Sequence, residues 1–169
     1  TLREIHEHVE SAFDDRHQPI RRTGVVQDVT ERKTLQRALI ESEMRLRGFM
    51  HNAPVGMVLK DLDDRYLMAN PAIARPLGMN PEQLIGRRLG EVLPGAVADT
   101  IQQQDRAVLS SNAATVFENY FPELERESWT QVVTFPVRDS EDRTVALGTI
   151  VTDISERKRT EQELDRLVH

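Results

Sequence analysis

Three acidic side chains, Asp61, Asp63 and Asp64, lie close together and are the first candidates for metal binding or acid–base chemistry. They stand between two short apolar runs, where a turn is routinely rich in Asp. His6 and His8 alternate on a predicted strand, so both imidazoles share one face, but a pair lacks the further ligands of a metal site. The sequence has no Cys, no phosphate-binding glycine loop and no Ser/His/Asp arrangement. These observations predict a non-catalytic chain without a metal.

Composition limits the classes of protein that this chain can represent. Its 169 residues are enough for one sizeable core. A net charge of −6 argues against a nucleic-acid partner. No apolar run approaches the roughly 18–20 residues that span a bilayer. The absence of Cys excludes disulfides and agrees with a reducing compartment. We therefore expect a cytoplasmic chain with no membrane span in this segment.

One strand-to-helix junction is written twice in the sequence, as "GVVQDVTERK" at residues 24–33 and "TIVTDISERK" at residues 149–158. An offset of 125 residues aligns the two copies, with their upstream segments, without a gap. Each copy reads as strand, polar turn, strand and helix. We expect the first copy, residues 1–29, to be the last two strands of a domain that begins upstream, and the second to complete a whole domain.

The segment between the two copies predicts an α+β unit. A helix runs from Thr30 to about Met50, and a hairpin pairs strands over 56–60 and 65–70. Short helices punctuated by Gly and Pro follow, then a longer helix over 96–110. Strands over 114–122, 128–138 and 143–152 close the unit. The expected fold is one antiparallel five-stranded sheet with short helices on one face, flanked by amphipathic helices.

Several short motifs in this order resemble the PAS sensor domain family. They are Asn70-Pro71-Ala72, Leu77-Gly78, "PEQLIGR" at 81–87, the hairpin "FPVRDSEDR" and the terminal "DISERK". The resemblance covers Met50–Ser155. Asp64 stands where the family usually has Gly, and Ile73 and Met79 stand where it often has aromatic residues. The resemblance implies a truncated PAS domain at 1–29, a linker helix at 30–50, a PAS domain at 51–153 and a second signalling helix from 154 to 169.

The repeated junction has two interpretations. Its polar residues are capable of capping the first turn of the following helix, which stabilises a helix start by about 1 kcal/mol. The resemblance implies more, namely that the joint transmits a distortion of the sheet into the helix. The six junction residues are Asp28, Thr30, Arg32, Asp153, Ser155 and Arg157.

The linker helix carries a heptad seam. Its apolar positions are Leu35, Leu39, Leu46 and Phe49, with Ser42 as a polar interruption. Two to three heptads are too few for a stable isolated coiled coil. The seam either packs on its own sheet or joins two chains in parallel, and we expect a homodimer.

Strand and helix periodicity also selects residues that point into the domain. They make an ordinary filled core, the wall of a pocket for a small organic or carboxylate ligand, or a cofactor site. The flavin and hydroxycinnamoyl members of the family need a cysteine, and haem members use an internal histidine. Neither occurs between Asn52 and Val168, so we expect no cofactor. The candidate lining residues are Met57, Leu59, Met68, Ile73, Leu77, Val97, Ile101, Phe117, Trp129, Val133 and Ile150.

The sequence leaves two alternatives open for the role of Arg87 and Arg88, and two for the function of the chain. Arg87 and Arg88 either pair with an anionic ligand or form a solvated connection. The chain is either a ligand-responsive sensor or a ligandless dimerisation and relay module. The resemblance implies a larger signalling protein with a histidine kinase or cyclic-di-GMP enzyme as its output.

Overall fold

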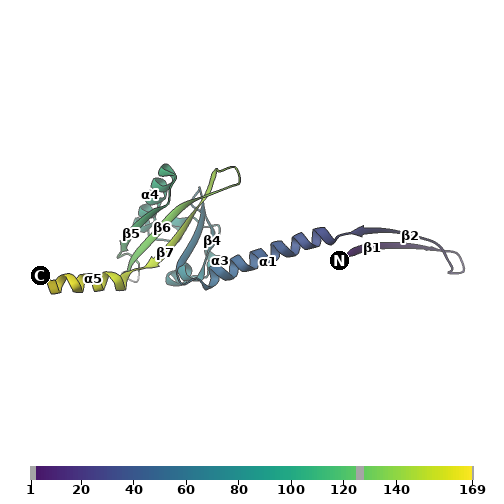
Figure 1. Ribbon diagram of the computed structural model, residues 1–169, viewed down its shortest axis with the longest axis horizontal. Helices are drawn as coiled ribbons and strands as arrows, with labels where there is room; N and C mark the ends of the chain where they lie inside the picture. Colours follow the sequence, from purple (N-terminus) through teal and green to yellow (C-terminus); the bar gives the residue numbers. More distant parts are fainter. Residues whose placement is uncertain (1–2, 125–127, 169) are drawn as a thin grey trace. The chain divides into compact units, whose positions relative to one another are not determined.

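A computed structural model describes residues 3–124 and 128–168 (Figure 1). The chain divides into two compact units, Thr1–Gly48 and Phe49–His169, and the division falls within helix α1. No helix of the described ranges is long and apolar enough to cross a membrane. The elements in chain order are β1 (Ile5–Phe13), β2 (Pro19–Asp28), α1 (Thr30–Asn52), β3 (Gly56–Asp61), β4 (Tyr66–Ala69), α2 (Pro71–Ala74), η1 (Arg75–Leu77), α3 (Pro81–Leu84), η2 (Leu89–Glu91), α4 (Gly95–Ser111), β5 (Thr115–Phe121), β6 (Ser128–Arg138), β7 (Thr144–Asp153) and α5 (Ser155–Val168).

The first unit is an antiparallel hairpin, β1–β2, followed by most of α1. The strands pair from Ile5↔Asp28 outward to a bulge between Ala12 and Phe13. Every residue of both strands is exposed. A two-stranded ribbon without a covered face is marginal on its own, so β1–β2 lacks the burial that usually stabilises a sheet.

The second unit contains a five-stranded antiparallel sheet in the order β4-β3-β7-β6-β5. This sheet and the helices between β4 and β5 confirm the predicted α+β fold. Buried side chains from the short helices and α4 pack against one face of the sheet. This core comprises Val58, Tyr66, Ala74, Leu84, Leu89 and Ala98.

Asn70 explains why a helix begins directly after β4. Its side-chain oxygen accepts hydrogen bonds from the backbone N–H of Met57 (2.9 Å) and Ile73 (3.2 Å). Its amide group donates to the carbonyl oxygens of Met50 (3.0 Å) and Val55 (2.9 Å). Asn70 is almost completely buried. One side chain therefore caps α2 and holds the last turns of α1 beside β3.

The same turn closes three hairpins. In each, an Asp side chain accepts hydrogen bonds from backbone N–H groups two and four residues later. The three residues are Asp14, Asp61 and Asp139. The fourth residue of each turn has a positive φ: His17 (59°), Asp64 (68°) and Asp142 (61°). Asp64 therefore occupies a left-handed position that glycine adopts more easily.

Candidate functional site

A cavity of about 550 Å³ lies between the sheet and the helices of the second unit. Small-molecule sites in proteins usually have volumes of roughly 300–1,000 Å³ and mostly apolar walls. From the sheet, Gly56, Val58 and Val132 line this cavity, and from α4, Val97 and Ile101 do so. The cavity has the size and the apolar walls that a small organic ligand needs.

The structure places four of the predicted lining residues at the cavity: Ile73, Leu77, Val97 and Ile101. All four come from helical segments, where the predicted inward face was correct. Phe117 pairs with the lining residue Val132 and so shares its sheet face, but it does not line the cavity.

The remaining six predicted residues lie on the opposite face of the sheet, so their inward placement was wrong. In β3 the lining residues are Gly56, Val58 and Lys60, which alternate with the predicted positions. Cross-strand pairing carries this alternation through the sheet, because directly paired residues share a face. The six residues on the far face are Met57, Leu59, Met68, Trp129, Val133 and Ile150.

Lys60 is the main cavity residue that sequence reasoning missed. Only 2% of its surface is exposed. Its ammonium group donates to Asp64 Oδ1 at 2.7 Å and to Asp105 Oδ2 on α4. Gln102, also on α4, donates to Asp64 Oδ2 at 2.8 Å. The only sequence signal was a Lys inside a short apolar strand, and it marked a buried ion network.

Burial changes the acid–base properties of this network. Desolvation raises the pKa of Asp105, although the neighbouring Lys60 opposes the rise. Burial also raises the pKa of Tyr66, which lines the cavity, and the charges of Asp64 and Asp105 add to that rise. The Tyr66 hydroxyl therefore stays protonated and available as a hydrogen-bond donor.

The remaining histidines and the two predicted arginines lie on the surface of the described residues. His6, His8 and His51 are exposed. Arg87 and Arg88 are also exposed and do not line the cavity. Across residues 3–124 and 128–168, no group of three His, Cys, Asp or Glu side chains is placed to hold a metal ion.

The second candidate feature is the joint between β7 and α5. Asp153 Oδ1 accepts from the Ser155 N–H at 2.8 Å. Ser155 Oγ accepts from the Trp129 N–H of β6 at 3.0 Å. The backbone bonds Ile154 N–H to Trp129 O (2.8 Å) and Lys158 N–H to Ile154 O (3.0 Å) complete the joint. The start of α5 is thus tied to both strands of the preceding hairpin.

The joint between β2 and α1 repeats these hydrogen bonds one by one. Asp28 Oδ1 accepts from the Thr30 N–H at 3.0 Å, and Thr30 Oγ1 accepts from the Glu4 N–H at 2.8 Å. The Val29 N–H donates to Glu4 O and the Lys33 N–H to Val29 O, both at 3.0 Å. Each bond has its counterpart 125 residues later, so the sequence repeat is also a repeat of geometry.

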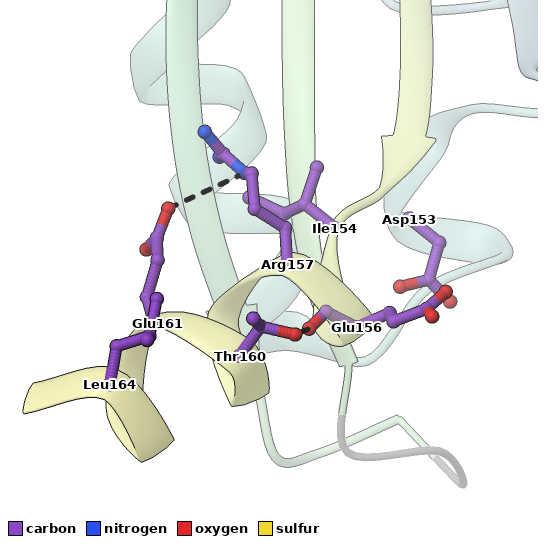
Figure 2. A pocket seen from close by; sticks show the side chains of 7 residues that line it. All are labelled: Asp153, Ile154, Glu156, Arg157, Thr160, Glu161 and Leu164. Carbon is purple, nitrogen blue, oxygen red and sulfur yellow. Dashed lines mark hydrogen bonds and ion pairs between the residues drawn. The ribbon is translucent and has the colours of Figure 1, made fainter. Parts of the chain in front are cut away.

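Ion pairs and a cation–π contact stabilise the second joint. Glu118 of β5 pairs with Arg157 and with Lys158 (2.7 Å), and these hydrogen bonds lower the pKa of Glu118. Figure 2 shows Arg157 reaching along α5 toward Glu161, at 3.9 Å. The Lys158 ammonium also lies over the Trp129 ring, 5.2 Å from its centre. The first turns of α5 are therefore held by two neighbouring strands.

In the first joint, the acidic partner of the ion pairs comes from a different place in the fold. Glu4, on the chain leading into β1, pairs with Lys33 (2.9 Å) and Arg37 of α1. Hydrogen bonds from both lower the pKa of Glu4. The predicted junction residue Arg32 is exposed, and Lys33 and Arg37 supply the ion pairs.

The predicted seam of α1 is exposed to solvent. Leu35 (65%), Leu39 (60%), Leu46 (52%) and Phe49 (66%) each expose at least half of their surface. No residue of α1 is buried.

Comparison with known proteins identifies the family. The model of the family described as "PAS fold" matches residues 50–159 of this chain, and these residues include the cavity and the second joint. The chain belongs to the PAS family. The PAS domain of BvgS from Bordetella pertussis has the same fold, with a TM-score of 0.59 and 19% identity over 75% of this chain and 96% of that one.

Two curated relatives are larger signalling proteins. The sensor histidine kinase TmoS of Ectopseudomonas mendocina is 26% identical over 77% of this chain. The probable diguanylate cyclase DgcE of Escherichia coli is 25% identical over 76% of it. The chain spans 14% and 12% of the lengths of these two relatives. The similarity is that of a sensory PAS module, which is regulatory and not catalytic.

Proposed function

We propose that this PAS domain binds a small, mostly apolar molecule in its cavity. The conformational change that follows binding is transmitted through α5 to an output domain, in the cytoplasmic part of a larger signalling protein. The cavity of about 550 Å³ beside α4 is the observation that carries the proposal. The similarities to a histidine kinase and a diguanylate cyclase support either enzyme as the output. Binding by a folded protein raises its stability in proportion to the logarithm of ligand concentration, once that exceeds the dissociation constant.

A screen of small organic compounds against the purified chain tests the sensor function. We expect a subset of apolar compounds to raise the unfolding temperature, with shifts that grow with concentration. A variant in which Ile101 is replaced by Trp fills the cavity from α4 and should abolish those shifts. Stabilisation that is equal in the Ile101→Trp variant and the parent chain would show that the compounds bind elsewhere.

The alternative is a ligandless module that dimerises and relays a signal. The exposed seam of α1 and the repeated joint favour this function. In both alternatives, we propose that α1 pairs with α1 of a second chain and that residues 1–29 are the end of an upstream PAS domain. Sedimentation of the Leu39→Ala/Leu46→Ala variant tests the pairing, because a dimer held by this seam should dissociate. The matched control is Arg47→Ala on the same helix.

Transmission through α5 has its own test in the full-length signalling protein. A heptad insertion after Lys158 returns the following seam to the same face, so output should be largely retained. A four-residue insertion rotates that face and should change output strongly. Asp153→Ala should make output constitutive or unresponsive while the stability of the domain changes by about 1 kcal/mol, the usual worth of a helix cap. Equal outputs from the two insertions would rule out transmission by helix register.

A further inference from the structure

The buried ammonium of Lys60 stands at the boundary between the cavity and a pair of carboxylates. It lines the cavity and also bonds Asp64 in the β3–β4 turn and Asp105 on α4. Asp64 has a φ of 68°, a conformation that costs a non-glycine residue free energy. The ion pair with Lys60 and the hydrogen bond from Gln102 offset that cost. The turn thus supplies a charged partner for Lys60 at a position where a glycine would supply none.

The hydrogen bonds already formed by Lys60 and Tyr66 show which donors are left for a ligand in the cavity. A lysine ammonium has three donors. Within the described residues, Lys60 donates to Asp64 and Asp105. One N–H therefore remains for an acceptor in the cavity. Tyr66 lines the same cavity, and its hydroxyl forms no hydrogen bond within the described part of the chain. Lys60 and Tyr66 therefore offer the cavity two donors, and Thr130, which also lines it, adds a buried hydroxyl with no hydrogen-bond partner among the described residues.

Charge decides which acceptor suits these donors. Asp64 and Asp105 place two carboxylates beside the one ammonium of Lys60, and the charge of the exposed Arg106 also acts on Asp105. An anionic ligand beside Lys60 would bring a third negative group into a buried site, where repulsion is strong. A neutral acceptor meets no such repulsion. The surrounding wall is apolar, formed by Val58, Leu89 and Val97 among others.

We propose that the ligand is a neutral, mostly apolar molecule with one hydrogen-bond acceptor, such as a ketone or amide oxygen. This acceptor receives a hydrogen bond from Lys60. The proposal rests on the ligand-binding function proposed above. The acceptor adds a third bond to an ammonium already shared between the β3–β4 turn and α4. The ligand is thereby linked to both elements through one side chain. Carboxylates of the same size are excluded by Asp64 and Asp105.

Three probes of similar size separate these requirements: acetophenone, ethylbenzene and benzoate. Their binding to the whole chain is measured at neutral pH by titration of backbone amide NMR shifts. A hydrogen bond to a charged donor predicts that acetophenone binds about tenfold more tightly than ethylbenzene. Benzoate should bind more weakly than either. Contacts between the acetophenone methyl group and the Lys60 Hε protons should appear in the bound state.

Each outcome bears on a different claim. Equal binding of acetophenone and ethylbenzene would overturn the role of Lys60 and leave the ligand-binding function intact. Tightest binding by benzoate would overturn the argument from charge. No binding by any of the three would contradict both the ligand-binding function and this proposal.

A variant provides the matched control. Lys60→Met alone leaves the buried carboxylate of Asp105 without its ammonium partner and endangers folding. The double variant Lys60→Met/Asp105→Asn removes one ammonium and one carboxylate together. We expect its preference for acetophenone over ethylbenzene to fall below about twofold, because the charged donor that distinguishes them is gone. A preference that stays near tenfold in a folded double variant would overturn the proposal, and the three probes on the unmodified chain test it if the variant does not fold.

Discussion

The hairpin β1–β2 with α1 and the hairpin β6–β7 with α5 have the same register, the same bulge, the same turn and the same joint. Their surroundings differ. β6 and β7 lie inside a five-stranded sheet and line a cavity, whereas β1 and β2 are exposed along their whole length. Local hydrogen bonding is therefore encoded in each segment by itself, and burial is what distinguishes the two copies.

Replacing one inward-facing residue of the buried copy by its counterpart in the exposed copy should cause the largest loss of stability. Val132 of β6 is 6% exposed, and its counterpart in β1 is Glu7. Val132→Glu places a carboxylate in an apolar wall, which should destabilise the second unit by about 3 kcal/mol or more. Urea unfolding followed by the fluorescence of the single Trp129 measures the loss. Glu7→Val is the control and should leave that transition unchanged; a similar loss in both variants would contradict the contrast in burial.

The same contrast explains what the sequence predicted well. The helix predicted over 96–110 agrees with α4, which Asn112 ends in the left-handed conformation, and Asn80 forms a capping box before Pro81. The turns followed from Asp61 and Asp139, which bond their own backbone. These features depend on neighbours in sequence, so sequence reasoning reached them.

The faces of the strands were harder to predict, because both sheet faces carry apolar residues. In β3, Met57 and Leu59 lie on one face, and Gly56 and Val58 line the cavity on the other. Alternation identifies an inward face only when the outward face is polar. The buried Lys60 made the cavity face look like the solvent face. Its partner Asp105 is far away in sequence, so no local pattern revealed the ion pair.

A second exchange tests close packing on the far face of the sheet. A Cβ added at Gly148 of β7 would lie 2.5 Å from a ring carbon of Phe135. Its counterpart in β2 is the exposed Thr23, which pairs with Glu10 of β1, whereas Gly148 pairs with Phe135. Gly148→Thr should destabilise the second unit by about 1–3 kcal/mol through overpacking.

The reverse substitution is the matched control for this exchange. Thr23→Gly should weaken β1–β2 by about 0.5–1 kcal/mol through backbone entropy alone. Urea unfolding measures the first loss, and amide hydrogen exchange in β2 measures the second. An unchanged unfolding midpoint for Gly148→Thr would mean that the Phe135 ring swings aside freely.

Removal of the joint hydroxyls should affect both copies to a similar extent. Thr30→Ala and Ser155→Ala each delete the acceptor of one backbone N–H, that of Glu4 and that of Trp129, and Thr30→Ala also removes a longer bond from Thr30 Oγ1 to Glu4 O at 3.3 Å. Both bonds are partly buried, so each loss should be about 1 kcal/mol. Hydrogen exchange of the Glu4 and Trp129 amides should quicken correspondingly. Faster exchange at one joint only would show that the two copies differ in strength as well as in surroundings.

Acidification should produce the smallest effect and separate the joints by their charges. The pKa values of Glu4 and Glu118 are both lowered from the ordinary 4.5 by hydrogen bonds from basic residues of the following helix. A lowered pKa in the folded state means that the stabilisation is complete above that ordinary value and is lost as pH falls through the folded value. Both ion-pair clusters should therefore weaken below about pH 4.5. Carboxyl NMR titrations measure the two pKa values directly.

The joints should then differ in what remains at low pH. Lys158 still lies over the Trp129 ring after Glu118 is protonated, and cation–π attraction does not depend on that carboxylate. The first joint has Glu4 where the second has Trp129, so no aromatic contact with Lys33 replaces the ion pair when Glu4 is protonated. Asp28 and Asp153 accept the same hydrogen bond in the two joints, so their protonation does not distinguish them. Amide exchange at pH 3 should therefore quicken more at Lys33 than at Lys158. In the variant Trp129→Leu that difference should shrink, because the aromatic contact is the feature that only the second joint possesses. Equal exchange at the two lysine amides in the unmodified chain would mean that the shared backbone hydrogen bonds hold both joints without help from side-chain charge.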